Sequence, residues 1–168
     1  MPIDLPNAES LLARLIEQIR PDVTPRTALV GIHTGGAWLA ERLHRSLGIQ
    51  ASLGTIDVSF YRDDYGSKGL HAKPQRSDIP FDVENADIII VDDVLYTGRT
   101  TRAALNELFD YGRPARVDLA VLCDRHGREL PISARYCAHT LDEPLAASRI
   151  LRLSQDATGT LSLRLIDA

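Results

Sequence analysis

The sequence has little of what marks secreted disulfide-rich proteins and membrane proteins. Only two cysteines, Cys123 and Cys137, occur among 168 residues, and two cysteines do not make a disulfide framework. The longest apolar stretches, such as residues 86–91 with Asp87 among them, are far shorter than the roughly 20 residues that a membrane-spanning helix needs. Because no basic segment leading into an apolar stretch opens the sequence, we expect no signal peptide and a cytoplasmic protein.

The sequence also has no run of lysines or arginines, and its formal net charge is −4. Proteins that bind nucleic acid through its phosphates usually carry a basic patch. The charge balance therefore weighs against RNA binding, although scattered arginines can gather on a folded surface. Apolar residues make up 44% of the chain, which is enough for a core, and the length suits a single domain over residues 1–168.

Alternating helix-like and strand-like patterns predict an α/β fold. One helix follows a capping residue, Asn7, a second ends at Gly48, and a third lies near residues 100–110. Strands that alternate with helices favour a mostly parallel central sheet, flanked by helices and joined by right-handed crossovers. We expect strands at residues 27–32, 55–61, 88–91 and 117–123, and a closing hairpin at about residues 148–166.

Residues 62–80 are the one long segment without apolar periodicity. They combine charged residues with glycines and prolines. A loop of this length inside a compact domain is either a functional lid or a disordered insertion, and the sequence pattern alone leaves both alternatives open.

The strongest chemical signal follows the strand at residues 88–91. Ligands bind beyond the carboxyl ends of strands in open parallel sheets, and this strand leads directly to Asp92 and Asp93. Residues 96–101, Tyr-Thr-Gly-Arg-Thr-Thr, then open a helix, whose unsatisfied N–H groups and dipole make an anion site. Gly98 permits close approach of the backbone, and the threonine hydroxyls can donate further hydrogen bonds. The carboxylates can hold ribose hydroxyls or a Mg²⁺ that also touches substrate phosphates.

Other phosphate-binding motifs are absent from the sequence. No Gly-x-x-x-x-Gly-Lys-Ser/Thr occurs, which excludes a P-loop, and no Gly-x-Gly-x-x-Gly follows a strand. A phosphatase of the Asp-x-Asp-x-Thr kind is excluded because Val94 stands where its second aspartate belongs. A solvated acidic turn would explain two aspartates alone, but not the whole run from the apolar strand through Thr101.

Residues 88–100, IIIVDDVLYTGRT, resemble the phosphoribosyl pyrophosphate (PRPP) signature of type I phosphoribosyltransferases. More narrowly, VDDVLYTGRTTRAALNELFDYGRPARV and the later ELPI resemble the PyrR family, pyrimidine-operon regulators that are also uracil phosphoribosyltransferases. The similarity extends back through DVSFYRDD and VGIHTGG, so that it covers about residues 27–140. It implies a type I phosphoribosyltransferase fold with a flexible flap loop at about residues 60–81 and a small base-binding hood.

The resemblance also implies a reaction, a Mg²⁺ cofactor and a homo-oligomer. The enzyme would transfer the ribose phosphate of PRPP to uracil, yielding UMP and pyrophosphate. Asp92 and Asp93 would be the catalytic carboxylates, which bind the ribose hydroxyls and help to organise Mg²⁺. The 5′-phosphate would be wrapped by Leu95, Tyr96, Thr97, Gly98, Arg99, Thr100 and Thr101. Pyrophosphate would be held by His33, Thr34, Gly35 and Gly36, the flap would contain Tyr61, Arg62, Asp63 and Asp64, and Asp124, Arg125 and His126 would line the base pocket.

The turn at residues 33–36 departs from the family pattern, which reads Thr-Arg-Gly. Gly35 stands in the place of the arginine, so that a cation facing pyrophosphate is missing unless His33 or Arg62 replaces it. A second hypothesis is therefore a UMP-sensing, RNA-binding attenuator of pyrimidine-biosynthesis genes that binds their leader transcript with weak or no catalysis. A third is the same enzyme acting on a purine base, against which the resemblance of residues 117–133 to the PyrR family argues.

Overall fold

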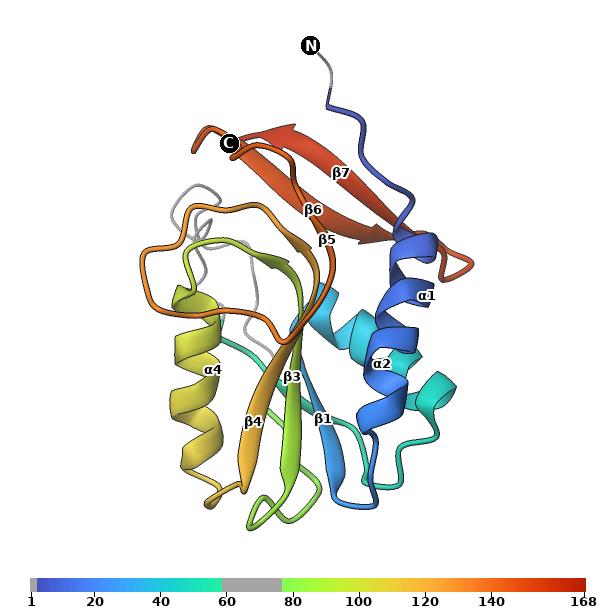
Figure 1. The fold of residues 1–168 in the computed structure, drawn as a ribbon, viewed down its shortest axis with the longest axis vertical. Coiled ribbons are helices and arrows are strands. Elements are labelled where there is room, and N and C mark those ends of the chain that lie inside the picture. The colour runs from blue at the N-terminus through green and yellow to red at the C-terminus, as the bar shows by residue number, and fades with distance from the viewer. Residues whose placement is uncertain (1–2, 59–76) are drawn as a thin grey trace.

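A parallel five-stranded sheet forms the centre of the computed structural model, which describes residues 3–58 and 77–168 (Figure 1). Each of its four strand pairings is parallel, and the spatial order is β2-β1-β3-β4-β5. Parallel neighbours require crossover connections, which accounts for the alternation of helices and strands along the chain. The strands are β1 (Thr27–Ile32), β2 (Gly54–Ile56), β3 (Asp87–Leu95), β4 (Arg116–Asp124) and β5 (Tyr136–Thr140).

Within residues 3–58 and 77–168, three α-helices cover the two faces of this sheet. Helices α1 (Ala8–Ile19) and α2 (Gly35–Leu47) share one apolar core with the sheet, and α4 (Arg99–Phe109) lies on the opposite face (Figure 1). A short 3-10 helix, η1 (Arg20–Asp22), follows α1. A second apolar core lies between α4 and the sheet, and β3 contributes residues to both cores. The residues of β3 are buried almost throughout, as expected for a strand that is covered on both faces.

The ends of the first two helices are specified by local chemistry. The side chain of Asn7 accepts a hydrogen bond from the backbone N–H of Ser10 at 2.9 Å, which satisfies one of the unpaired donors at the start of α1. Helix α2 ends at Gly48, whose φ of 62° is the left-handed conformation that glycine adopts without a steric penalty. Both boundaries agree with the sequence-based prediction.

A two-stranded antiparallel hairpin, β6 (Arg149–Gln155) and β7 (Leu161–Asp167), lies across the end of the molecule toward which the sheet strands run (Figure 1). Its inner side buries Leu151, Leu153 and Leu161 against the rest of the protein. The hairpin that the sequence predicted at about residues 148–166 is therefore present, and it covers the carboxyl end of the sheet.

The structure differs from the sequence-based prediction in three elements. Strand β3 continues through Asp92 and Asp93 to Leu95, because its pairing with β4 extends past the apolar run. The strand expected at residues 55–61 is shorter, since Asp57 and Val58 lie beyond the end of β2. Strand β5 was not predicted, because it is short and only Tyr136 and Ala138 are buried in it.

Most of the predicted flap lies outside the described residues, and so do Tyr61, Arg62, Asp63 and Asp64. Among the helices of residues 3–58 and 77–168, none is both long and apolar enough to cross a lipid bilayer.

Candidate active site

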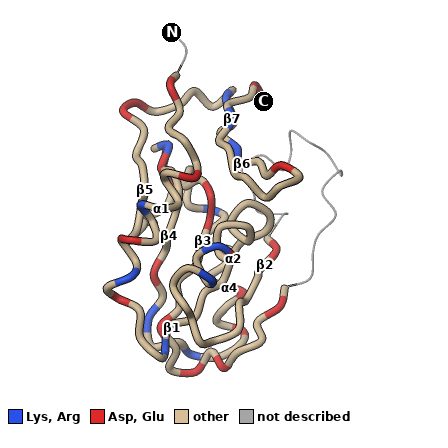
Figure 2. Tube along the Cα trace, turned by 90° about the vertical axis from the view of Figure 1, so that its right-hand side faces the viewer, with Lys and Arg blue, Asp and Glu red and all other residues tan. Residues whose placement is uncertain are grey.

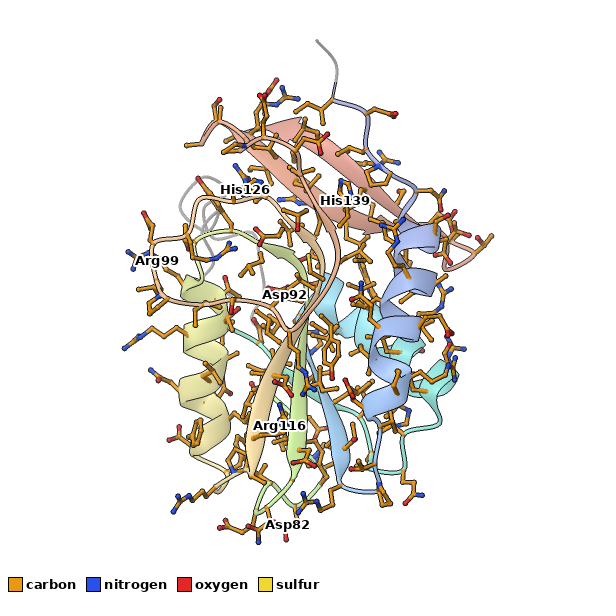
Figure 3. All side chains as sticks on the ribbon, in the orientation of Figure 1. Asp82, Asp92, Arg99, Arg116, His126 and His139 are labelled. Atoms are coloured by element: carbon orange, nitrogen blue, oxygen red, sulfur yellow. The ribbon has the colours of Figure 1, made fainter. Side chains whose placement is uncertain are left out.

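Two adjacent carboxylates lie at the carboxyl end of the central strand. Asp92 and Asp93 belong to β3, and only 7% of the surface of each is exposed. Each side chain uses Oδ1 to accept the backbone N–H of the next residue, from Asp93 and Val94 respectively, both at 2.8 Å. Figure 3 shows Asp92 near the middle of the molecule, between His126 on the side of the hairpin and Arg116 and Asp82 on the opposite side. The carboxylates thus stand where ligands bind in open parallel sheets.

The glycine-rich turn that follows β1 packs directly onto this pair. A Cβ atom on Gly35 would stand 2.5 Å from Oδ2 of Asp93, and one on Gly36 would stand 2.3 Å from the carbonyl oxygen of Val91. The peptide between His33 and Thr34 is cis, and the N–H of His33 donates to the carbonyl of Ile56 at 2.9 Å. The absence of side chains at positions 35 and 36 therefore lets the turn and the carboxylates meet.

The segment from Leu95 to Thr101 joins the end of β3 to the first turn of α4 through a tight loop of residues 96–98. Gly98 precedes the helix with φ of 95°, and the N–H of Arg99 donates to Oγ1 of Thr97 at 3.2 Å. Thr97 and Thr101 are buried. The first N–H groups of this 11-residue helix face the same end of the sheet as Asp92, so the segment has the geometry of an anion site.

The side chain of Arg99 points away from this loop. Its Nε lies 2.9 Å from Oε1 of Glu129, and about half of each side chain is exposed. Arg99 therefore contributes backbone to the predicted 5′-phosphate loop, while its guanidinium forms a surface ion pair, which is a weak interaction in water.

Residues 124–130 hold the loop from its other side. Asp124 accepts a hydrogen bond from the N–H of His126 at 2.9 Å and forms an ion pair with Arg128 at 2.5 Å. Arg128 also donates to the carbonyl of Tyr96 at 2.7 Å. The carbonyl of Thr97 accepts N–H groups of the same segment, from Glu129 at 2.9 Å and Leu130 at 3.2 Å. The predicted phosphate and base segments are thus one hydrogen-bonded unit.

The three residues predicted to line the base pocket make further contacts inside the protein. The ring of His126 lies 2.6 Å from the carbonyl of Leu141. Arg125 is 4% exposed, its guanidinium lies 3.8 Å from the centre of the Tyr96 ring, and it donates to the carbonyls of Ala146 and Arg149.

Sequence reasoning missed Arg128 as a member of this site. Its spacing of four residues from Asp124 was the available signal, but such spacing is informative only on a helix, and this segment is irregular.

The donor set suits Mg²⁺ that takes most of its ligands from a substrate. Mg²⁺ is usually bound by one or two carboxylates together with water and substrate phosphates, and Asp92 and Asp93 supply two carboxylates. Within the described ranges, no three His, Cys, Asp or Glu side chains come together as a complete protein-made metal site. The residues present therefore fit a metal that arrives with its substrate.

Comparisons with known proteins agree with this geometry. The model of the phosphoribosyl transferase domain family matches residues 3–146. The bifunctional protein PyrR of Pseudomonas aeruginosa (strain LESB58) is 51% identical over 143 residues, which cover 83% of this chain and 84% of that protein. This chain belongs to the PyrR family. Its resemblance to PyrR also holds over greater length, since the bifunctional protein PyrR of Nitrosococcus oceani is 48% identical over 95% of this chain and 88% of that protein.

Solved structures place the PyrR-type chain among the type I phosphoribosyltransferases in fold. A hypoxanthine-guanine phosphoribosyltransferase from Bacillus anthracis has a TM-score of 0.66 over 84% of this chain and 85% of that chain, at 19% identity. At that identity the likeness concerns the fold alone. The predicted fold class and the predicted family are both confirmed.

Proposed function

We propose that this chain is a uracil phosphoribosyltransferase of the PyrR type, which makes UMP and pyrophosphate from uracil and PRPP. One observation carries the proposal: two buried carboxylates, a glycine-rich turn and a helix N-terminus with buried threonines converge at the carboxyl end of β3. A substrate with ribose hydroxyls between a phosphate and a pyrophosphate matches those three features. Family membership supports the same activity.

Each part of PRPP has a matching part of the site. The N–H groups and hydroxyls of residues 97–101 would bind the 5′-phosphate at the start of α4. Asp92 and Asp93 would accept hydrogen bonds from the ribose hydroxyls. The turn of residues 33–36 would hold the pyrophosphate, with the backbone N–H groups after His33 as donors in the manner of an anion-binding nest, since the N–H of His33 itself donates to Ile56.

The reaction needs no nucleophilic side chain. The bond from C1 of the ribose to the pyrophosphate oxygen breaks with its electron pair, and N1 of uracil forms the new bond to C1 and loses its proton. Positive charge builds on the sugar meanwhile, as in an oxocarbenium-like state. Mg²⁺ bound with PRPP would stabilise the departing anion. The protein contributes orientation of the two reactants, donors for the anion and, through the flap, exclusion of water.

The residues that follow β4 would read the base. Uracil presents alternating carbonyl and N–H groups, which backbone groups of the segment that begins at Asp124 would recognise. The N–H groups of Arg125 and His126 already donate to Leu95 and Asp124, so this recognition would fall to their neighbours in the segment. The hairpin of β6 and β7 would form the hood over this pocket. We place the protein in the cytoplasm and expect a homo-oligomer.

The decisive experiment measures formation of UMP and pyrophosphate from PRPP, Mg²⁺ and uracil, with hypoxanthine, guanine and orotate in parallel. Turnover with uracil alone is the expected result. Asp93→Asn should reduce kcat/KM by about 100-fold, because it removes a charge at the reacting sugar. Asp87→Asn is the matched control, since Asp87 begins the same strand and pairs with Arg26 away from the site. Turnover with a purine but not with uracil would refute the base assignment.

A second activity, binding of an RNA leader of pyrimidine genes under the control of UMP, is favoured by the relatives' name, bifunctional protein PyrR. Positive and negative residues are interspersed along the chain (Figure 2), so an RNA-binding surface would have to form from arginines that the fold brings together. A filter-binding titration against that leader, with and without UMP, tests the activity. RNA binding that strengthens with UMP and weakens with salt is expected, because contacts to phosphate release counterions. Absent or salt-independent binding would refute it.

A further inference from the structure

Arg125 connects three segments that lie far apart in the sequence. Its Nη1 donates to the carbonyl of Arg149 at 2.8 Å, and its Nη2 donates to the carbonyl of Ala146 at 3.1 Å. The same guanidinium lies over the ring of Tyr96, with Cζ 3.8 Å from the ring centre. Because two hydrogen bonds fix the plane of the guanidinium, the position of the Tyr96 ring is fixed with it.

The backbone of the same segment holds Tyr96 as well. A Cβ atom on Gly127 would lie 2.5 Å from Cε1 of Tyr96, so the backbone at this glycine packs against the edge of the ring. The N–H of Arg125 donates to the carbonyl of Leu95 at 3.1 Å, and Arg128 donates to the carbonyl of Tyr96. Tyr96 is thus held by its ring, by its own carbonyl and through the residue before it.

Tyr96 immediately precedes the residues whose N–H groups and hydroxyls would bind the 5′-phosphate. We propose that Arg125 is a positioning residue for this phosphate loop, and that it acts through the ring of Tyr96 rather than by touching the base. With 4% of Arg125 exposed, little of its surface remains for a ligand. This inference rests on the proposed function, and it replaces the contact with the base that the family resemblance implied.

Lysine cannot replace arginine in this arrangement. A guanidinium is planar, so it can stack on an aromatic ring while its edge donates two hydrogen bonds in fixed directions. The ammonium of lysine is a point charge on a flexible stem, and it would hold either the ring or the carbonyls. Arg125→Lys therefore keeps the charge and removes the geometry.

The test is steady-state kinetics of Arg125→Lys with each substrate varied in turn. We expect the KM for PRPP to rise about tenfold, with kcat and the KM for uracil within twofold of the wild type. A displaced phosphate loop weakens binding of the 5′-phosphate equally in the ground state and in the transition state. Arg135→Lys is the matched control: Arg135 lies over the ring of Tyr136 at 5.3 Å, away from the site. It should leave all three parameters unchanged.

A second variant and a binding measurement keep the inference testable whatever the turnover is. Tyr96→Leu removes the ring, so it should raise the KM for PRPP by a similar factor, and the double variant should be no worse than either single one. Calorimetric titration with ribose 5-phosphate needs no catalysis, and its Kd should rise about tenfold in Arg125→Lys. A wild type without turnover would refute the proposed function, and this titration would still decide the role of Arg125.

Two results would overturn the inference. A raised KM for uracil with an unchanged KM for PRPP would make Arg125 a base-binding residue. Unchanged PRPP kinetics and unchanged ribose 5-phosphate affinity in both variants would show that the contact with Tyr96 does not position the loop.

Discussion

Gly35 lies directly against Asp93: a Cβ atom at position 35 would stand 2.5 Å from Oδ2 and 2.8 Å from Cγ of that carboxylate. The carboxylate of Asp93 therefore occupies the space that a side chain at position 35 would need. In this conformation the turn and Asp93 act as one unit. The departure from the family's Thr-Arg-Gly pattern is thus coupled to the position of a candidate catalytic carboxylate.

Gly35→Ala should impair catalysis more than stability. The new methyl group meets the end of a side chain, which can swing away, so the fold survives while the carboxylate of Asp93 is displaced. We expect kcat/KM for PRPP to fall by about tenfold or more, since small misplacements at a reacting centre are costly. Gly48→Ala is the control. Nothing lies within 4 Å of its Cβ position, so it should cost only about 1 kcal/mol of stability, from its positive φ, and leave the kinetics unchanged. Unaltered kinetics in Gly35→Ala would contradict the coupling.

Gly36→Ala should instead destabilise the fold. A Cβ atom there would lie 2.3 Å from the carbonyl oxygen of Val91 and 3.0 Å from Cα of Asp92, and both are backbone atoms of the central strand. Backbone cannot move aside cheaply, so we expect a loss of about 1–3 kcal/mol, as in other overpacked cores. Urea unfolding measures it, and an unchanged midpoint would show that the turn can shift away from β3.

The protein should lose stability at alkaline pH. Burial raises the pKa of Cys123 to about 12, and burial together with a hydrogen bond to Asp22 raises the pKa of Tyr136 to about 12. Both neutral forms are favoured by folding, so their contribution is complete below the ordinary values of 9.0 and 10.0 and is lost as pH rises toward 12. Urea unfolding measured from about pH 8 to about pH 11.5 should show this decline in the free energy of unfolding. Tyr136→Phe should make the decline shallower, and an equal slope in both proteins would exclude Tyr136 as a cause.

Asn7→Ala should lower the free energy of unfolding by about 1 kcal/mol. The substitution removes the acceptor that pairs with the N–H of Ser10 at the start of α1. Asn7→Ser retains an acceptor and should recover most of the loss. Equal unfolding midpoints for the alanine variant and the wild type would mean that water replaces the cap without cost.

Local patterns were sufficient to predict the main elements of the fold. The apolar run before Asp92 needed only its composition to indicate a strand buried on both faces, and the observed β3 is buried accordingly. Strand β5 escaped prediction because its stability comes from the neighbouring β4 and from burial of Tyr136, which depends on residues distant in sequence.

The sequence by itself determined the helix caps, the central strand and the clustering of acids, glycine and threonines after that strand, because each depends on residues within a few positions of one another. Only the tertiary structure decided that Gly35 meets Asp93 and that Arg125 holds Tyr96. Those contacts join segments that belong to different strands of the sheet. They form only after the strands have paired in register. Short stretches of sequence therefore supply the chemical groups of the site, whereas the assembled sheet determines how those groups are placed relative to one another.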